Sequence, residues 1–323
     1  MDFYRLERDF QAVGFFETEQ HRQLMRAIRP ALLSGKLAAI TGPVGSGKTL
    51  FLRRFEAILE QEGRLTVARS LSVDKDRTTL SSLIAALFYD LSSDKNPKIP
   101  THGEERERAL RDLVRRGRKP VVLIVDEAHD LHLKTLVGLK RLMEVVADDG
   151  GTLAIILAGH PKLRNDLRRP TMEEIGYRSV HFALDGAIED RPAYVTLLIG
   201  ACKAKDAAVA SMIDDAAIAL LAARLRTPLQ IEQHLTLAFE HGFRCGEKPV
   251  TAELLEAELL ETVLSRQLDD LEPRLTRHGY SVKNLADQFN AKPAEVRLFL
   301  RGAFDAERTR ELSDQMRVAG LPL

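Results

Sequence analysis

The stretch GPVGSGKT, residues 42–49, has the residue types and the spacing of a phosphate-binding loop. Its glycines allow backbone N–H groups to turn inward around phosphate oxygens. Lys48 would reach the β- and γ-phosphates, and the Thr49 hydroxyl would ligate Mg²⁺. We therefore expect ATP and Mg²⁺ to bind here, with contacts from Gly42, Pro43, Val44, Gly45, Ser46, Gly47, Lys48 and Thr49.

An acidic pair follows an apolar run in VVLIVDEAHD, residues 121–130. Asp126 would hold Mg²⁺ through water, and Glu127 would polarise the water that attacks the γ-phosphate. The same pair could simply mark a strand that ends in solvent. The letters DEAH also occur in helicases, but those resemble two tandem nucleotide-binding domains, and no room for a second core remains here.

These residues need strands and helices to position them, and the sequence alternates between the two. Apolar runs rich in β-branched residues are typical of strands buried on both faces. Helical patterns lie between them, which predicts βαβ units, a parallel five-stranded sheet and helices on both sides. The predicted strands are Leu37–Thr41, Leu65–Ser70, Val121–Val125, Leu153–Ala158 and Ser179–Leu184. The predicted helices are Thr49–Gln61, Leu80–Leu91, Glu104–Arg116 and Leu133–Val146.

After the last of these strands the pattern becomes helical throughout, with apolar residues spaced three and four apart. We expect four segments: a helical entry over 1–36, a nucleotide-binding core over 37–187, a helical domain over 188–265 and a C-terminal helical segment over 266–323.

Composition restricts the classes of function. Lys+Arg and Asp+Glu both number 47, so local patches rather than a global field would direct any binding to DNA. The two cysteines form neither a disulfide framework nor a metal-ligand spacing. The charged start MDFYRLERDF lacks the apolar region of a signal peptide, and no apolar run approaches a membrane span. We expect a cytoplasmic protein without membrane contact.

Several stretches together resemble one family. They are RDFQAVGFFETEQHRQLMRAI, AAITGPVGSGKT, LIVDEAHDL, LKRLMEV and LAIILAGHPKLRNDL. They are similar to the AAA+ ATPases of the ExeA/TnsC/TniB group, which includes transposition ATP-binding proteins related to IstB and MuB. The resemblance implies an AAA+ αβα core, a helical lid over 188–265, a ring or filament of identical subunits on double-stranded DNA, and a separate transposase as partner.

The resemblance also assigns roles to two residues outside the motifs above. His160 follows the fourth strand, where relatives carry a polar sensor of the γ-phosphate; it could instead be a polar residue at a strand end. Arg178 precedes the fifth strand, where an arginine finger would reach the ATP of a neighbouring subunit. Arg178 could instead be an ordinary surface arginine, with Arg164, Arg168 and Arg169 as nearby competitors for the role.

One position departs from the family pattern. Relatives carry an arginine after the proline of a lid turn, whereas this chain reads RTPLQ over 226–230 and has Leu229 in that place. A lid contact with the γ-phosphate is therefore in doubt, and we expect hydrolysis that is slow or that depends on DNA or a partner.

Two regions could contact DNA. Lys75 and Arg77 lie in a loop on the side that faces DNA in similar ring- or filament-forming ATPases, although acidic neighbours fit a solvated loop as well. In the C-terminal stretch SVKNLADQFNAKPAEVRLFLRG, the spacing matches a helix-turn-helix. Lys292, Arg297 and Arg301 would then project towards DNA. A plain helical hairpin that packs on the lid or binds a protein is the alternative.

The sequence thus predicts an α/β P-loop AAA+ ATPase with a helical lid and a C-terminal helix-turn-helix-like segment, acting in ATP-dependent DNA transposition. The chain has no evident DDE-type nuclease site, so a partner would cut the DNA. Three alternatives stay open: an NTPase-switch transcription regulator, an ExeA-like secretion-associated ATPase, and an adaptor that binds ATP without hydrolysing it.

Overall fold

The computed structural model describes residues 2–70, 78–94, 96–168, 179–184, 188–257, 271–300, 306–318 and 321. The chain divides into two compact units. One unit contains Met1–Phe16, Pro43–Gly47 and Gly186–Leu323, and the other contains Glu17–Gly42 and Lys48–Asp185. The second unit holds the sheet and is described first.

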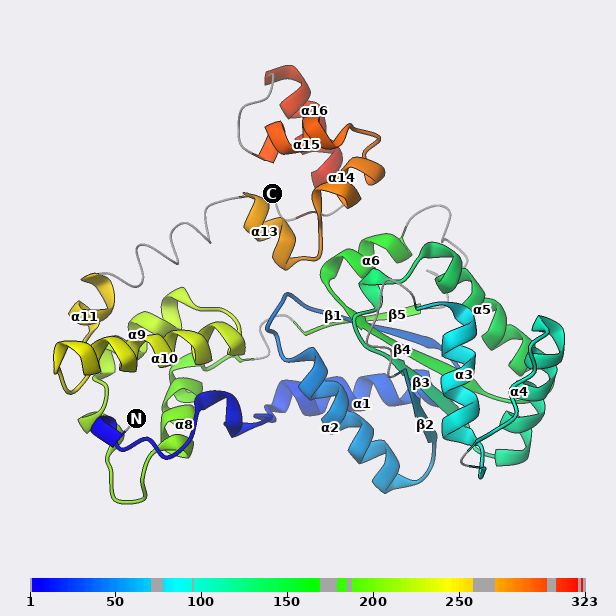
Figure 1. The fold of residues 1–323 in the computed structure, drawn as a ribbon, viewed down its shortest axis with the longest axis horizontal. Coiled ribbons are helices and arrows are strands. Elements are labelled where there is room, and N and C mark those ends of the chain that lie inside the picture. The colour runs from blue at the N-terminus through cyan, green and yellow to red at the C-terminus, as the bar shows by residue number, and fades with distance from the viewer. Residues whose placement is uncertain are drawn as a thin grey trace. The chain divides into compact units, whose positions relative to one another are not determined.

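A five-stranded parallel sheet runs in the order β2-β3-β4-β1-β5 (Figure 1). The registers place Leu37 of β1 opposite Ile155 of β4 on one side and Ser179 of β5 on the other. The prediction of an α/β fold with a parallel five-stranded sheet is confirmed. The strands are β1 (Leu37–Thr41), β2 (Thr66–Arg69), β3 (Val121–Val125), β4 (Leu153–Gly159) and β5 (Ser179–Ala183).

Every residue of the three central strands is buried, which is why their sequences are continuous apolar runs rather than alternating ones. β2 and β5 lie at the two edges and are only partly buried. Odd-numbered residues of the central strands, such as Leu123 and Ile155, pack on one layer of helices. This layer consists of α3 (Leu80–Leu91), α4 (Gly103–Gly117), α5 (Leu133–Asp148) and α6 (Pro161–Leu167).

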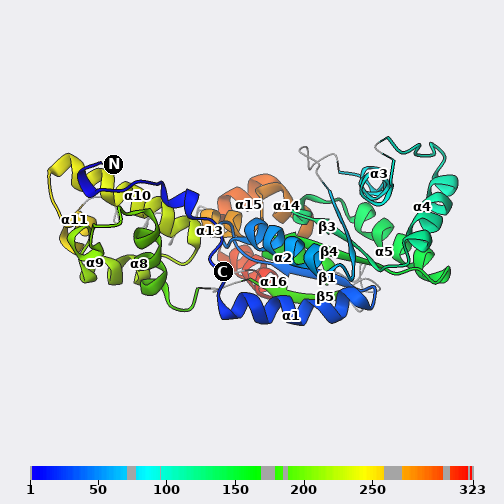
Figure 2. The same ribbon diagram turned by 90° about the horizontal axis from the view of Figure 1, so that it is seen from below.

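The even-numbered residues of the central strands, such as Ile40 and Ile124, are 0% exposed as well, so the opposite face of the sheet is also covered. Helices α1 (Glu19–Leu33) and α2 (Lys48–Glu62) contact the strands and each other, with the ring of His21 5.9 Å from that of Phe51. Figure 2 shows this unit from a second direction, with α1 and α2 beside the strands.

Helix α1 begins with a capping box in FFETEQH, which is part of one of the stretches that resemble the family. The Thr18 hydroxyl accepts the His21 N–H at 3.2 Å, and His21 Nδ1 accepts the Thr18 N–H at 3.1 Å. Burial lowers the pKa of His21. The folded protein therefore favours the neutral form of His21, which accepts a backbone N–H at the start of the helix.

The other unit is built around a helical core that the N-terminal segment helps to complete. Tyr4 and Phe10 both pack on Phe239, at ring distances of 4.8 and 5.7 Å, and the Tyr4 hydroxyl donates to the carbonyl of Glu247. The elements are η1 (Asp2–Tyr4), η2 (Phe10–Val13), α8 (Arg191–Cys202), η6 (Val209–Ser211), α9 (Asp215–Arg224), α10 (Pro228–Cys245) and α11 (Ala252–Ala257).

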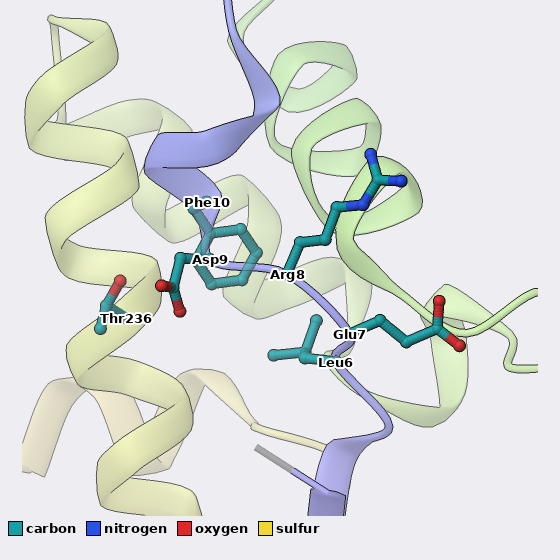
Figure 3. Close-up of a pocket in the computed structure, with 6 residues that line it drawn as sticks. All are labelled: Leu6, Glu7, Arg8, Asp9, Phe10 and Thr236. Carbon is teal, nitrogen blue, oxygen red and sulfur yellow. The ribbon is translucent and has the colours of Figure 1, made fainter.

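The N-terminal segment and α10 enclose a small hollow. Figure 3 shows Asp9 extending towards Thr236 of α10, while Arg8 extends away from it. The volume is about 200 Å³, less than the roughly 300–1,000 Å³ of a site for a small molecule. We assign it no ligand.

The C-terminal segment has a core of its own. Its helices are α13 (Leu271–Arg277), α14 (Val282–Gln288), α15 (Pro293–Leu300) and α16 (Ala306–Val318). Ala286 of α14 and Val296 of α15 are buried in this core. Asn290 forms the turn between those helices with φ of 48°, a conformation that asparagine tolerates. The predicted helix, turn and second helix are therefore present.

Candidate active site

The phosphate loop connects the end of β1 to the start of α2, as the sequence predicted. Gly45 and Gly47 have φ of 78° and 86°, in the left-handed region that favours glycine. A Cβ at Gly47 would meet nothing within 4 Å, so the backbone conformation is what requires glycine there. A Cβ at Gly45 would lie 2.6 Å from that of Leu229, whose N–H donates to the Gly45 carbonyl at 3.3 Å.

Lys48 is the first residue of α2 and is buried, with 6% exposed. Its Nζ donates to the Gly42 carbonyl at 2.9 Å, which holds the ammonium against the loop. The N-terminus of α2 points into the same loop, so its backbone N–H groups and the lysine offer positive charge to one anion.

The Thr49 hydroxyl donates to Asp126 Oδ2 at 2.7 Å. The other oxygen of Asp126 accepts the N–H of Glu127 at 2.9 Å, which fixes the carboxylate in place. Hydroxyl and carboxylate oxygens are the donors that Mg²⁺ prefers. The two predicted magnesium residues, from α2 and from the end of β3, therefore lie together with suitable chemistry.

Glu127 adopts a left-handed conformation, with φ of 54° and ψ of 35°. This conformation is uncommon for a residue with a side chain and marks stored strain of about 1–2 kcal/mol. It precedes the short helix η4 (Ala128–Asp130) and turns the carboxylate towards the end of β4. Glu127 Oε2 lies 3.9 Å from His160 Nε2, so the predicted catalytic carboxylate and the predicted sensor share one site.

A second histidine lies in the same place and was missed by the sequence reasoning. His129 Nδ1 is 3.4 Å from Glu127 Oε2, and its ring stacks on that of His160 at 3.7 Å. Gly159 allows this approach, because a Cβ there would lie 3.0 Å from the His129 backbone nitrogen. The occurrence of a histidine two residues after Glu127, and another after the next strand, is the signal that would have found the pair.

Lys162, on α6, stabilises the part of the site that contains His129 and His160. Lys162 Nζ pairs with Asp166 Oδ2 at 2.7 Å and lies 3.4 Å from the His129 carbonyl. The lysine and the aspartate are both buried, and the paired opposite charge compensates their loss of hydration. The backbone of His129 is thereby tied to the helix that follows His160.

Burial also shifts the pKa values of two polar side chains in the helical unit. The Tyr194 hydroxyl donates to Glu232 Oε1 at 3.2 Å, and burial raises the pKa of both groups. This pair links α8 to α10, the helix whose first turn contacts Gly45.

Several predicted residues lie outside the described part of the chain: Arg178, Lys75, Arg77 and Arg301. Lys292 and Arg297 are described, and both are exposed on the C-terminal segment. The backbone N–H of Lys292 donates to Glu295 Oε2 at 3.0 Å, which leaves its ammonium out of that contact. The expected DNA contacts therefore remain predictions.

The basic run in α4 makes ion pairs on the protein surface. Arg111 and Arg115 each lie 3.5 Å from Asp149, and Arg108 lies 3.9 Å from Glu104. Such pairs between partly exposed side chains are typical of a solvated helix face. A hollow of about 850 Å³ between α3, α4 and α5 is lined by residues such as Leu133 and Arg141.

Comparison with known proteins agrees with this geometry. Residues 32–167 match the family model described as AAA domain. General secretion pathway protein A of Aeromonas hydrophila is 28% identical over 167 residues, which cover 50% of this chain and 29% of that protein. Subtilin transport ATP-binding protein SpaT of Bacillus subtilis is 34% identical over 82 residues, 25% of this chain and 13% of that protein. The matched region thus spans less than a third of either curated relative.

Solved structures share the fold over most of the chain. The Aeropyrum pernix ORC2 protein in its ADP form has a TM-score of 0.57 at 14% identity, covering 98% of this chain and 90% of that one. Cdc6p from Pyrobaculum aerophilum has a TM-score of 0.56 at 15% identity, covering 98% and 91%. The Aeropyrum pernix ORC1 protein in complex with DNA has a TM-score of 0.52 at 16% identity, covering 98% and 88%.

At these identities the likeness concerns the fold, which is an AAA+ core with a helical region. An AAA domain with this phosphate loop implies NTPase activity and the binding of a nucleotide with Mg²⁺. Among the described residues, no helix has both the length and the apolar character needed to cross a membrane.

Proposed function

We propose that this protein is an ATPase that assembles on double-stranded DNA in its ATP-bound state and there recruits or activates a separate transposase. The observation that carries the ATPase part is the hydrogen bond between Thr49 and Asp126, with Glu127 next in the chain. The transposition part rests on the family-like motifs described above, of which the capping box at Thr18 and the glycine-histidine turn at Gly159 have defined structural roles.

Each site residue then has one task. The loop amides and Lys48 bind the phosphates, and Lys48 exchanges its hydrogen bond to Gly42 for one to phosphate oxygen. Thr49 and Asp126 would hold a Mg²⁺ ion, which supplies charge neutralisation on the β- and γ-phosphates. Glu127 orients and polarises the attacking water, and His160 senses the γ-phosphate from the neighbouring strand.

The presence of Leu229 in place of an arginine supports the expectation that basal hydrolysis is slow. Its side chain packs against Gly45 in the position where relatives would place an arginine towards the γ-phosphate. Hydrolysis would then depend on a neighbouring subunit, through Arg178, or on DNA and the transposase. Turnover of the protein alone, compared with turnover in the presence of DNA, tests this point, and fast basal turnover contradicts it.

Binding to DNA has two sources of support. One solved structure with this fold is the Aeropyrum pernix ORC1 protein in complex with DNA. The C-terminal segment exposes Lys292, in the turn before α15, and Arg297, on α15 itself. Lys75, Arg77 and Arg301 are the further basic residues that we assign to DNA phosphates.

A second candidate is a secretion-associated ATPase, and the match to general secretion pathway protein A favours it. A transcription regulator that reads one operator through the C-terminal segment is a third. These three functions differ in what the ATP-bound protein covers: long stretches of DNA, no DNA, or one site.

Negative-stain electron microscopy with duplex DNA separates them. We expect rings or filaments on DNA with ATP but not with ADP, persistent in Glu127→Gln and absent in Lys48→Ala. DNA that stays bare in every nucleotide state would overturn assembly on DNA. A footprint at one sequence would instead support the transcription regulator.

A further inference from the structure

The corner formed by Glu127, His129 and His160 has the ligand types of a transition-metal site. One ligand atom from each of the three residues lies within 4.8 Å of the others. The three side chains come from two places that the sheet brings together, the turn after β3 and the residue after β4. We propose that these residues bind Zn²⁺ or a cation of similar preference, and that the bound cation prevents Glu127 from activating water.

The distances fit coordination better than direct hydrogen bonding. Glu127 Oε2 lies 3.4 Å from His129 Nδ1 and 3.9 Å from His160 Nε2. Hydrogen bonds between nitrogen and oxygen have lengths of roughly 2.7–3.2 Å. Two ligands on a tetrahedral zinc ion, each about 2.0–2.1 Å from the metal, are separated by about 3.3 Å. The separations are therefore close to those of ligands around one ion, and a rotation of the imidazole rings would bring both nitrogens to face it.

The second ring nitrogen of His129 is also in a suitable place. His129 Nε2 lies 3.6 Å from Asp130 Oδ1. A histidine that binds a metal through one nitrogen commonly donates its other N–H to a carboxylate, which orients the ring and strengthens the ligand. Asp130 would provide this support, and Lys162 holds the His129 backbone through its carbonyl.

Ligand chemistry separates this site from the magnesium site beside it. Thr49 and Asp126 offer oxygen atoms, which Mg²⁺ prefers, whereas the corner offers two imidazoles and one carboxylate. Two histidines and a glutamate with a fourth position left for water form a set typical of zinc. Magnesium at ordinary concentrations would therefore occupy the oxygen site and leave the corner to a softer cation.

Binding of a metal ion by both histidines would change the arrangement of their rings. The rings of His129 and His160 are stacked with an interplanar angle of 21°. A metal ion lies in the plane of each imidazole that binds it, so coordination by both rings requires them to tilt apart. The side chain of His160 is 14% exposed and that of Glu127 is 32% exposed, so a cation can reach the corner from solvent.

The first experiment measures binding without nucleotide, so it does not depend on ATP hydrolysis. Nucleotide-free full-length protein is titrated with Co²⁺, whose visible absorption reports tetrahedral coordination, and with Zn²⁺ by calorimetry. We expect one strong site. Its affinity should fall in His129→Phe, His160→Phe and Glu127→Gln. Loss of a residue that only supports a ligand costs roughly 10- to 100-fold in affinity, so loss of a ligand itself should cost at least as much. Glu127→Gln is nearly isosteric and keeps the test valid if a phenylalanine variant fails to fold.

A rival site provides the matched control. Cys245 Sγ lies 3.7 Å from His241 Nε2 on the exposed end of α10, and this pair could also bind zinc. Unchanged affinity in Cys245→Ser supports the corner. Loss of binding in Cys245→Ser, or the absence of binding up to millimolar Zn²⁺, overturns the proposal.

The inhibition, unlike the binding, rests on the proposed ATPase function. We expect Zn²⁺ to stop turnover and a chelator to restore it, with the inhibitory concentration raised in His129→Phe and His160→Phe in proportion to the weakened binding. Turnover that continues when the corner is occupied overturns the inhibition. Protein that binds Co²⁺ at the corner but never hydrolyses ATP contradicts the proposed function and leaves the metal site standing.

Discussion

The hydroxyl of Thr49 donates a 2.7 Å hydrogen bond to Asp126, although 77 positions separate the two residues in the chain. The contact exists because β1 and β3 are parallel and end at the same edge of the sheet, with β4 between them. The loop after β1 and the turn after β3 therefore meet. This edge is where open α/β sheets place their ligands.

Glu127→Gln should keep ATP binding and lose hydrolysis. The amide cannot polarise water as the carboxylate does, so turnover should fall by roughly 10²- to 10⁴-fold. Phosphate release and the binding of a fluorescent ATP analogue measure the two properties. The exposed Glu60→Gln on α2 is the matched control and should behave as the wild type. Equal losses of binding and turnover would show that Glu127 acts in binding instead.

Gly242→Ala should destabilise the protein, although alanine normally stabilises a helix. The added methyl would overlap the Tyr4 hydroxyl, which donates to the Glu247 carbonyl. We expect a loss of about 1–3 kcal/mol in the free energy of unfolding, as for other overpacked cores. Gly200→Ala on α8 meets no atom within 4 Å and should instead gain up to about 1 kcal/mol.

The double variant Gly242→Ala/Tyr4→Phe checks the cause, because it removes the hydroxyl that the methyl meets. Thermal unfolding should show part of the loss recovered relative to Tyr4→Phe alone. A loss of the same size in both backgrounds would mean that the overlap is not the reason.

Stability should fall as the pH is lowered below about 6.5, the usual histidine pKa. Burial lowers the pKa of His21 and of His234, so the unfolded chain takes up protons more readily than the folded one. The stability that these groups contribute is present above the unfolded pKa and is lost as the pH falls through the folded pKa. Denaturant midpoints between pH 7.5 and 5.5 measure the slope.

His21→Gln tests the contribution of one histidine to that slope. Glutamine can accept the Thr18 N–H and so preserve the capping box, but it does not titrate. We expect a shallower pH dependence with little change at pH 7.5. An identical slope in the variant would assign the effect to other groups.

Removing two exposed bases, one in the turn before α15 and one on α15, should weaken binding to DNA. Lys292→Ala/Arg297→Ala should lower the affinity for every duplex sequence and reduce the slope of log affinity against log salt by about 2. Fluorescence anisotropy at several salt concentrations measures both. Lys283→Ala, on the exposed side of α14, is the control. Unchanged affinity in the double variant would favour a protein-binding role for the segment.

Local pattern was sufficient to predict most of the sheet and several helices. The strands Leu37–Thr41 and Val121–Val125 and the helix Leu80–Leu91 have the predicted bounds, because runs buried on both faces and a capping threonine are visible in the sequence. The phosphate loop and the Asp126–Glu127 pair were predicted for the same reason: a motif that connects a strand to a helix determines its own local geometry. The alternation of strands and helices then implied that the phosphate loop and the acidic pair would meet.

Contacts between segments that are distant in sequence required the tertiary structure. The stacking of His129 on His160 depends on the close approach of Gly159, and the packing of Leu229 on Gly45 depends on where α10 begins. Residues Met1–Phe16 group with the helical unit, while Glu17–Gly42 group with the sheet. The sequence by itself determined which apolar runs are buried and which motifs carry chemistry. Which buried faces meet was decided by packing, because burial is non-directional and an apolar face does not specify its partner.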